Sequence, residues 1–273
     1  MTAQKIDIYQ VDAFTDQVFG GNPAAVCPLN KWLDDDVLQK IAFENNLSET
    51  AFFCLRPDGD YDLRWFTPTV EVDLCGHATL ATAHVIFNQL GCQSEILKFH
   101  SESGPLHVTR DGELLVLDFP ARPPQTIPLP DGFVGAVGAM PTKVLKSSKT
   151  LAIFQSVEVV AQLNPDINWI ANLEGDGLIC SAKVSADDQS QLDGQNYDFV
   201  SRYFAPHAGI DEDPVTGSAH SVLIPYWANK LNKNKMIARQ ISARGGTLRC
   251  EYVGDRVHIA GQGVLYLKGE IFI

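Results

Sequence analysis

The chain is organised around the stretch Asp73-Leu74-Cys75-Gly76-His77-Ala78-Thr79-Leu80-Ala81-Thr82-Ala83-His84. A second stretch, Asp213-Pro214-Val215-Thr216-Gly217-Ser218-Ala219-His220-Ser221, repeats its plan. In each stretch an acid precedes a glycine, a polar side chain (His77 or Ser218) follows it, and small residues then open an apolar, helix-like segment. We interpret both as tight turns that lead into helix N-termini. Free backbone N–H groups and the positive end of the helix dipole favour an anion at such a terminus.

Each motif by itself is also explained by close packing of small residues at a helix start, since such short signals are weak alone. The two motifs lie about 140 residues apart and place an acid, a glycine and a hydrogen-bonding side chain at similar offsets. This repetition indicates a duplicated half. Two such helix starts could bind one small anion together.

Composition narrows the function classes. The chain has 273 residues, with 33 acids against 21 bases and a formal charge of −12. This acidic balance without a basic cluster argues against nucleic acid or an anionic membrane surface as a partner. We find neither a secretory signal nor an apolar run long enough to span a membrane, and expect a cytoplasmic protein. The six cysteines form no CxxC pair, so reduced and mostly buried thiols are expected.

The stretch from residue 120 to 130 contains five prolines and is the best candidate for a domain boundary. We therefore predict an N-terminal half at residues 1–119, which the last strand (263–273) could join, and a C-terminal half at 120–262. The predicted fold class is α+β: two pseudo-symmetric halves of mostly antiparallel sheet, each wrapped around a central helix. The two central helices are predicted at residues 78–90 and 218–230.

Residue patterns predict the other elements. Alternating apolar residues and turn residues indicate strands at 5–14, 24–28, 51–55, 61–66, 96–100, 106–110 and 113–119, and then at 151–154, 157–163, 178–184, 197–204 and within 240–273. Apolar spacing and capping residues indicate helices at 34–45, 132–139 and 164–173.

Glu49 and Asn22 are candidate site residues outside the two motifs. Glu49 stands at the entrance to an apolar strand, where a carboxylate can be partly withdrawn from water as a general acid/base requires. A solvated acid at a strand end is the alternative. Asn22 precedes Pro23 and follows two glycines, so it either presents its amide to a ligand or serves the turn. We find no dinucleotide fingerprint and no zinc-ligand spacing, and expect neither a cofactor nor a metal.

Five ordered blocks resemble the PhzF-like family, the phenazine-biosynthesis-type isomerases with the diaminopimelate epimerase fold. The resemblance covers nearly the whole chain. The blocks are Asp12-Ala13-Phe14-Thr15 with Gly21-Asn22-Pro23-Ala24, Ser48-Glu49-Thr50-Ala51-Phe52, Phe66-Thr67-Pro68, Cys75-Gly76-His77-Ala78-Thr79, and Asp213-Pro214-Val215-Thr216-Gly217-Ser218-Ala219.

The resemblance implies a cofactor-free isomerase whose active site lies in a cleft between the halves. Glu49 matches the family's general acid/base, and His77, Asp213 and Ser218 match residues that line and polarise the site. The amides at Gly76 and Gly217 match its carboxylate-binding helix starts, and Asn22 matches a substrate-binding position. A small carboxylate is the implied substrate. Whether the protein is a homodimer stays open.

Two other function classes stay in view. The epimerase branch of the fold uses one thiol from each half; Cys75 aligns with the first, but the second motif has Pro214 where the other thiol is needed. This disfavours a two-cysteine racemase and leaves an epimerase with one base and another acid. Such an enzyme would exchange an α-hydrogen with solvent, whereas an allylic isomerase would move a double bond. The other class is a non-catalytic protein that binds a ligand or another protein.

Overall fold

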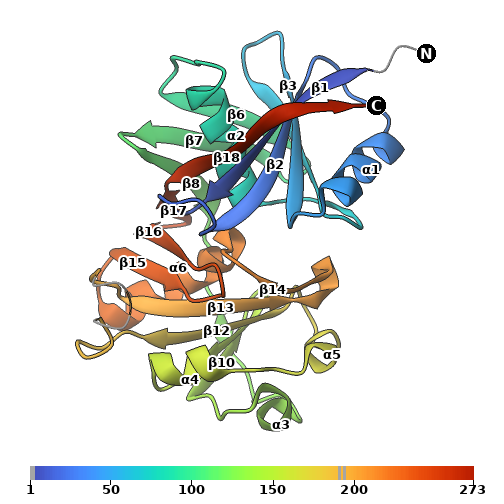
Figure 1. Cartoon of the computed structure of the whole chain (residues 1–273). Coiled ribbons are helices and arrows are strands. Elements are labelled where there is room, and N and C mark those ends of the chain that lie inside the picture. The colour runs from blue at the N-terminus through green and yellow to red at the C-terminus, as the bar shows by residue number, and fades with distance from the viewer. Residues whose placement is uncertain (1–3, 190–191, 193–194) are drawn as a thin grey trace. The chain divides into compact units, whose positions relative to one another are not determined.

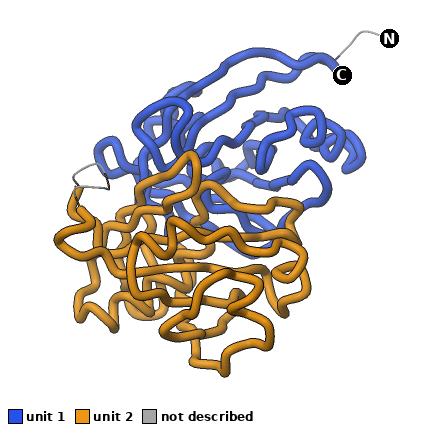
Figure 2. The backbone as a smooth tube through the Cα atoms, turned by 60° about the horizontal axis from the view of Figure 1, so that its bottom comes forward, with its two compact units in different colours: residues 1–118, 260–273 blue, residues 119–259 orange. Residues whose placement is uncertain are grey.

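The computed structural model describes residues 4–189, 192 and 195–273, and the chain divides into two compact units (Figure 2). One unit consists of residues 1–118 together with 260–273, and the other of residues 119–259. Each unit is an α+β structure of mostly antiparallel strands, which is the predicted fold class.

The first unit is a sheet in the order β18-β1-β2-β3-β4-β6-β7-β8, with β5 paired to the end of β4 (Figure 1). The β2–β3 and β4–β6 pairs are parallel, and the others are antiparallel. The elements are β1 (Lys5–Ala13), β2 (Asn22–Leu29), α1 (Asp35–Asn45), β3 (Glu49–Leu55), β4 (Tyr61–Phe66), β5 (Glu71–Val72), α2 (Gly76–Asn88), β6 (Ile96–Ser101), β7 (Gly104–Asp111), β8 (Leu114–Pro120) and β18 (Gly263–Phe272).

The second unit repeats this plan in the order β9-β10-β11-β12-β13-β15-β16, with β14 paired to β13. Here β11–β12 and β13–β15 are the parallel pairs. The elements are β9 (Gln125–Thr126), α3 (Phe133–Val137), β10 (Lys143–Lys146), β11 (Thr150–Ile153), α4 (Val157–Gln162), α5 (Ile167–Ile170), β12 (Leu178–Lys183), β13 (Phe199–Ala205), the 3₁₀ turn η2 (Pro206–Ala208), β14 (Ile210–Asp213), α6 (Gly217–Leu231), β15 (Lys235–Gln240), β16 (Gly246–Val253) and β17 (Arg256–Gly261).

The order of pairings is the same in both units. Strands β1 to β5, helix α2 and strands β6 and β7 correspond to β10 to β14, α6, β15 and β16, with each parallel pair at the same place. The two pseudo-symmetric halves predicted from the repeated motif are therefore present in the fold. The central helices also start alike. Thr79 Oγ1 donates to the Cys75 carbonyl at 2.6 Å, and His220 Nδ1 donates to the Thr216 carbonyl at 2.7 Å.

The central helices are buried because their residues are small or apolar around most of the circumference. All of α2 except His84 and Asn88 is buried, and the helix packs against β1, β2 and β3. Helix α6 contains Pro225, which has no N–H to donate to the carbonyl of Ser221. The backbone N–H of Arg122 donates to that carbonyl at 2.9 Å, so the hydrogen bond lost to proline is replaced from outside the helix.

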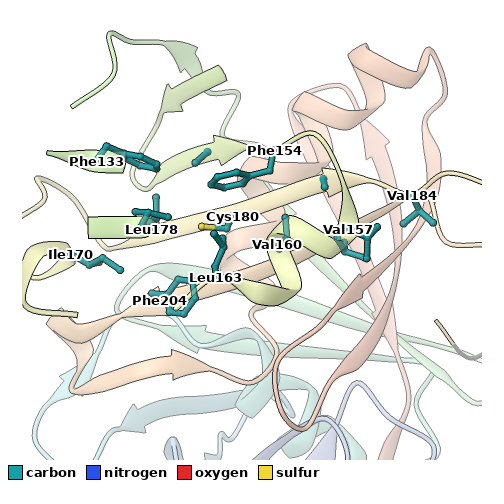
Figure 3. Packing of buried hydrophobic residues seen from close by; sticks show 14 of the residues in the cluster. Phe133, Phe154, Val157, Val160, Leu163, Ile170, Leu178, Cys180, Val184 and Phe204 are labelled. Carbon is teal, nitrogen blue, oxygen red and sulfur yellow. The ribbon is translucent and has the colours of Figure 1, made fainter. Parts of the chain in front are cut away.

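Residues 157–163, predicted as a strand, form helix α4 instead. Valines favour strands, but Ser156 accepts a hydrogen bond from the Val159 N–H and caps a helix that buries Val157 and Val160. Figure 3 shows both valines in one cluster with Cys180 of β12 and Phe204 of β13. The helix predicted at 164–173 is also shorter, since α5 covers only Ile167–Ile170.

Candidate active site

Glu49, His77 and Asn22 come together on one face of the first unit. Glu49 is the first residue of β3 and lies beside Ala24 of β2, while Asn22 begins β2 and His77 lies in the first turn of α2. Glu49 Oε2 lies 3.0 Å from His77 Nε2, and the Asn22 amide nitrogen lies 3.0 Å from His77 Nδ1. The exposed fractions of Glu49, His77 and Asn22 are 9%, 2% and 0%. A carboxylate, an imidazole and an amide thus lie in one buried row, with polar atoms of neighbouring side chains 3.0 Å apart.

The surroundings of His77 favour the protonated form of its ring. Burial lowers the pKa of His77, but Cys75 and Glu49 beside it raise the pKa, and the net result lies well above its ordinary value. Burial, with Glu49 nearby, raises the pKa of the Cys75 thiol to about 11, so this thiol is neutral near pH 7. A protonated ring donates from Nδ1, so Asn22 then presents its amide oxygen.

The turn before Asn22 contains three residues with positive φ angles. Phe14, Phe19 and Gly21 have φ angles of 63°, 70° and 60°, in the left-handed region. The Phe19 N–H donates to the Asp12 carboxylate at 2.8 Å. A Cβ on Gly21 would lie 2.1 Å from the Ala13 carbonyl oxygen, so only glycine fits there. The glycine pair that the sequence singled out therefore fixes the start of β2, where Asn22 lies.

Asp213 and Ser218 lie at the start of α6 in the second unit. Asp213 is 7% exposed, and its carboxylate accepts a hydrogen bond from Thr216 Oγ1 at 2.5 Å. Gln240, 0% exposed, donates to the Asp213 carbonyl at 2.7 Å and accepts from the Thr216 N–H at 2.9 Å. Ser218 is half-buried in the first turn of the helix. The sequence reasoning missed Thr216 and Gln240, because no local pattern marks a buried glutamine 27 residues after Asp213.

The structural counterpart of Cys75 is Thr216, not Pro214 as expected from the sequence of the second motif. Both residues are N-caps, one immediately before Gly76 and the other immediately before Gly217. The second half thus has a hydroxyl where the first has a thiol. Neither N-cap side chain makes a geometrically well-formed hydrogen bond to the first amides of its helix. The backbone donors at Gly76 and Gly217 keep this capacity for a ligand.

Among the residues that the structure describes, two groups of side chains have ligand atoms close enough together to hold a metal ion. Glu49, Cys75 and His77 have ligand atoms that all lie within 4.8 Å of one another, and Asp58, Asp60 and His100 form a second, more exposed group. The buried group would have to lose the Cys75 proton, because the thiolate is the metal ligand. His100 in the other group already lies 2.9 Å from the Asp60 carboxylate.

Comparison with known proteins shows which family the chain belongs to. The family model described as phenazine biosynthesis-like protein (PhzC-PhzF) matches residues 11–269. The chain belongs to the PhzC-PhzF family. An uncharacterized isomerase of Pseudomonas aeruginosa is 49% identical over 98% of this chain and 100% of its own length. Another uncharacterized isomerase, from Halalkalibacterium halodurans, is 44% identical over 97% of this chain and 98% of its own.

Solved structures of the family have the same fold. The crystal structure of a PhzF-family phenazine biosynthesis protein from Enterococcus faecalis superposes with a TM-score of 0.92 at 45% identity, covering 99% of this chain and 100% of that one. A hydroxyproline epimerase from Agrobacterium vitis, 9% identical with a TM-score of 0.63 over 98% of this chain and 93% of that one, shares the fold alone. No helix within the described residues is long and apolar enough to cross a membrane.

Proposed function

We propose that this PhzC-PhzF protein is a cofactor-independent isomerase that moves a proton, and with it a double bond, on a small carboxylate-bearing metabolite. The observation that carries the proposal is the buried contact of Glu49 Oε2 with His77 Nε2 at 3.0 Å. A carboxylate held in a water-poor site beside an imidazole whose protonated form is favoured has the chemistry of a general acid/base with its electrostatic support. The names of the relatives as isomerases agree with this class.

The proposed reaction has two proton transfers. The Glu49 carboxylate takes a proton from a substrate carbon, and the electron pair of that C–H bond is delocalised toward an electron-withdrawing group such as the carboxylate. Glu49, now a carboxylic acid, gives the proton to a second carbon on the same face, which leaves the double bond shifted by one position. The His77 imidazolium stabilises the charge that develops on oxygen, and Asn22 holds the ring in place through its contact at 3.0 Å.

The motif repeat motivates the rest of the proposal. Gly76 and Gly217 begin buried helices of 13 and 15 residues, whose N-terminal amides suit a carboxylate. We propose that Asp213 and Ser218 act on the same substrate as Glu49. The alternative for Asp213 is purely structural, since its hydrogen bond with Thr216 and its carbonyl contact with Gln240 already stabilise the turn before α6.

The test is a screen of small carboxylates in D₂O, read by proton NMR for moved double bonds and by mass spectrometry for deuterium. Glu49→Gln should lose at least about 100-fold of the turnover found with the wild-type protein, which is the lower range for a positioned acid/base. Glu44→Gln is the matched control, because Glu44 is an exposed glutamate only five residues earlier. Near-normal turnover in a folded Glu49→Gln variant would contradict the assignment.

Asp213→Asn supplies the second arm of this experiment. The asparagine oxygen can still accept the Thr216 hydrogen bond, so a purely structural Asp213 predicts nearly full turnover. A catalytic or charge-positioning Asp213 predicts a large fall in turnover at an unchanged melting temperature.

The same screen separates the alternatives. An epimerase would exchange an α-hydrogen of a chiral substrate with deuterium without moving a double bond, and a binding protein would bind carboxylates without any exchange. Cys75, neutral near pH 7, and Thr216 in place of a second thiol both favour the isomerase. Light scattering tests whether the protein is a homodimer, which the sequence left open, and cell fractionation checks the predicted cytoplasmic location.

A further inference from the structure

Trp65 is a buried tryptophan whose indole N–H donates no hydrogen bond to any described residue of the protein. Its side chain is 1% exposed, and within the described residues no acceptor lies within hydrogen-bond reach of Nε1. Buried indole N–H groups normally find a partner, since an unpaired buried donor loses its hydrogen bond to water without replacement. The other fully buried tryptophan follows this rule, because Trp227 Nε1 donates to Ser181 Oγ at 3.0 Å. Trp65 therefore requires an explanation.

The strand register places Trp65 on the same face of the sheet as Glu49. Trp65 of β4 lies opposite Ala51 of β3, and Glu49 lies two residues before Ala51. Side chains alternate between faces along a strand, and directly opposed residues share a face. Phe52 and Phe66, each one position away, pack on the other face in the cluster around α1. Trp65, Ala51 and Glu49 therefore share the face that carries His77.

Both neighbours of Trp65 in the sheet lead into the site. On one side Trp65 pairs with Ala51, which lies two residues after Glu49. On the other side Trp65 pairs with Val72 of β5, which is followed three residues later by Cys75, the N-cap of α2. Diagonal neighbours at this separation lie within reach of an aromatic side chain. An indole at this position is thus flanked by the segments that hold Glu49 and His77.

The repeat shows which way the side chain at this position reaches. Trp65 corresponds to Tyr203, since Tyr203 of β13 lies opposite Ile179 of β12 and Asp213 of β14. The Tyr203 hydroxyl donates to the carbonyl oxygen of Asp176, three residues before Ile179. The residue three before Ala51 is Ser48, the neighbour of Glu49. The polar end of the Tyr203 ring thus lies toward the strand start that in the first unit carries Glu49.

We propose that the indole N–H of Trp65 is a hydrogen-bond donor of the Glu49 site and binds an oxygen atom of the substrate. This inference rests on the proposed function and refines its substrate class: the group next to the transferred proton must carry an oxygen acceptor, a carboxylate or a carbonyl. Glu49 Oε2 is buried, and its contact with His77 is electrostatic rather than a directed hydrogen bond. A buried donor and a buried acceptor on one face are therefore both available to the same ligand.

The first test measures stability and needs no substrate. Trp65→Phe keeps an aromatic ring and removes the N–H, so we expect an unchanged or raised melting temperature. Trp227→Phe is the matched control, because it removes an N–H that is hydrogen-bonded in a tryptophan only 2% exposed. It should lower the melting temperature clearly. Equal destabilisation by the two substitutions would show that the Trp65 N–H is bonded inside the protein and would overturn the proposal.

The second test follows the indole itself by ¹H–¹⁵N NMR. The chain has four tryptophans, so the Trp65 indole signal can be assigned by its loss in Trp65→Phe or, if that variant does not fold, by elimination with the other three. Titration with acetate, succinate and benzoate should shift this signal saturably while the Trp227 signal stays in place. A Trp65 signal that does not move with any of these carboxylates, at concentrations that shift the backbone amide of Gly76 or His77, contradicts the proposal.

Turnover separates this inference from the proposed function. On any substrate found in the D₂O screen, Trp65→Phe should raise KM or lower kcat by about ten-fold or more, the effect of losing one hydrogen bond to a charged group. If Glu49→Gln abolishes turnover and Trp65→Phe does not change it, only the Trp65 inference is wrong. If Glu49→Gln keeps full turnover, the proposed function itself is wrong.

Discussion

Two buried histidines have opposite protonation preferences. His77 faces Glu49 and carries a raised pKa, whereas burial lowers the pKa of His220 to about 4. His220 donates from Nδ1 to the Thr216 carbonyl, and its Nε2 is buried with no hydrogen-bond partner within the described residues. A proton on Nε2 would place a charge in an apolar setting that includes the ring of Phe199, 6.0 Å away.

This difference predicts acid destabilisation through His220. An unfolded histidine takes up a proton near pH 6.5, but folded His220 does so only near pH 4, so the unfolded state binds more protons in between. The free energy of unfolding should therefore fall as pH decreases through this window, by about 3 kcal/mol from His220 alone. His220→Asn keeps a donor for the Thr216 carbonyl and cannot titrate. Urea unfolding from pH 8 to 4 should give a flatter curve for this variant, and parallel curves would contradict the prediction.

Single residues of the site were predictable to different degrees. Each of three residues carried a local signal: Glu49 stands at a strand entrance, His77 follows a glycine turn, and Asn22 precedes a proline. The structure brings these three side chains together. Gln240 and Trp65 could not, because their roles depend on register between strands distant in sequence. The thiol counterpart was misplaced at Pro214, whereas counting back one residue from the glycine of each motif pairs Cys75 with Thr216.

Among the elements, the turn from Phe14 to Gly21 is the one whose geometry most directly serves the site. Gly21→Ala should be strongly destabilising, because the residue has φ 60° and a Cβ there would lie 2.1 Å from the Ala13 carbonyl oxygen. Gly112→Ala is the matched control, since Gly112 has φ 61° but no atom within 4 Å of its Cβ position. We expect the control to cost about 1–2 kcal/mol for the left-handed backbone alone. Gly21→Ala should cost at least about 2 kcal/mol more.

Chemical denaturation of the two alanine variants measures this difference. Similar losses in both would mean that the close approach to Ala13 is relieved by backbone movement. In that case we would also expect the His77 ring signals to shift in NMR spectra of Gly21→Ala, since Asn22 follows directly and contacts His77 at 3.0 Å.

The helices show why the sequence predicted some elements and not others. Helices α2 and α6 were recognised because a glycine turn and a long apolar run mark them independently of their surroundings. Helix α4 was not, because its valines favour a strand locally and its helical state depends on packing against β12. Comparison of the two units explains why a helix is needed between β11 and β12. The parallel strands β11 and β12 need a crossover connection, as β2 and β3 have in α1.

At the scale of the whole molecule, the chain ends in the sheet where it begins. Strand β18 pairs antiparallel with β1 from Gly263↔Ala13 to Phe272↔Lys5, and the two strands lie side by side in Figure 1. The backbone of Ile273 also exchanges hydrogen bonds with that of Gln4. At the other end of β18, a Cβ on Gly263 would lie 3.2 Å from His84 Nδ1 and 3.3 Å from Leu80 Cδ2, so this strand covers part of α2.

We therefore predict that removing residues 263–273 damages the first unit and spares the second. The truncation removes the hydrogen-bond partners of β1 and uncovers Leu80 and His84 of α2, while the sheet from β9 to β16 keeps all its pairings. Each unit holds two tryptophans, Trp32 and Trp65 in the first and Trp169 and Trp227 in the second. Indole ¹H–¹⁵N spectra of a chain ending at Gln262 should show shifted or broadened signals for the first pair and native signals for the second. Adding a synthetic peptide of residues 263–273 should restore the first pair, since it supplies the missing strand. Equal loss of all four signals would mean that the second unit does not fold independently of the first, and four native signals would mean that β18 contributes little to the sheet.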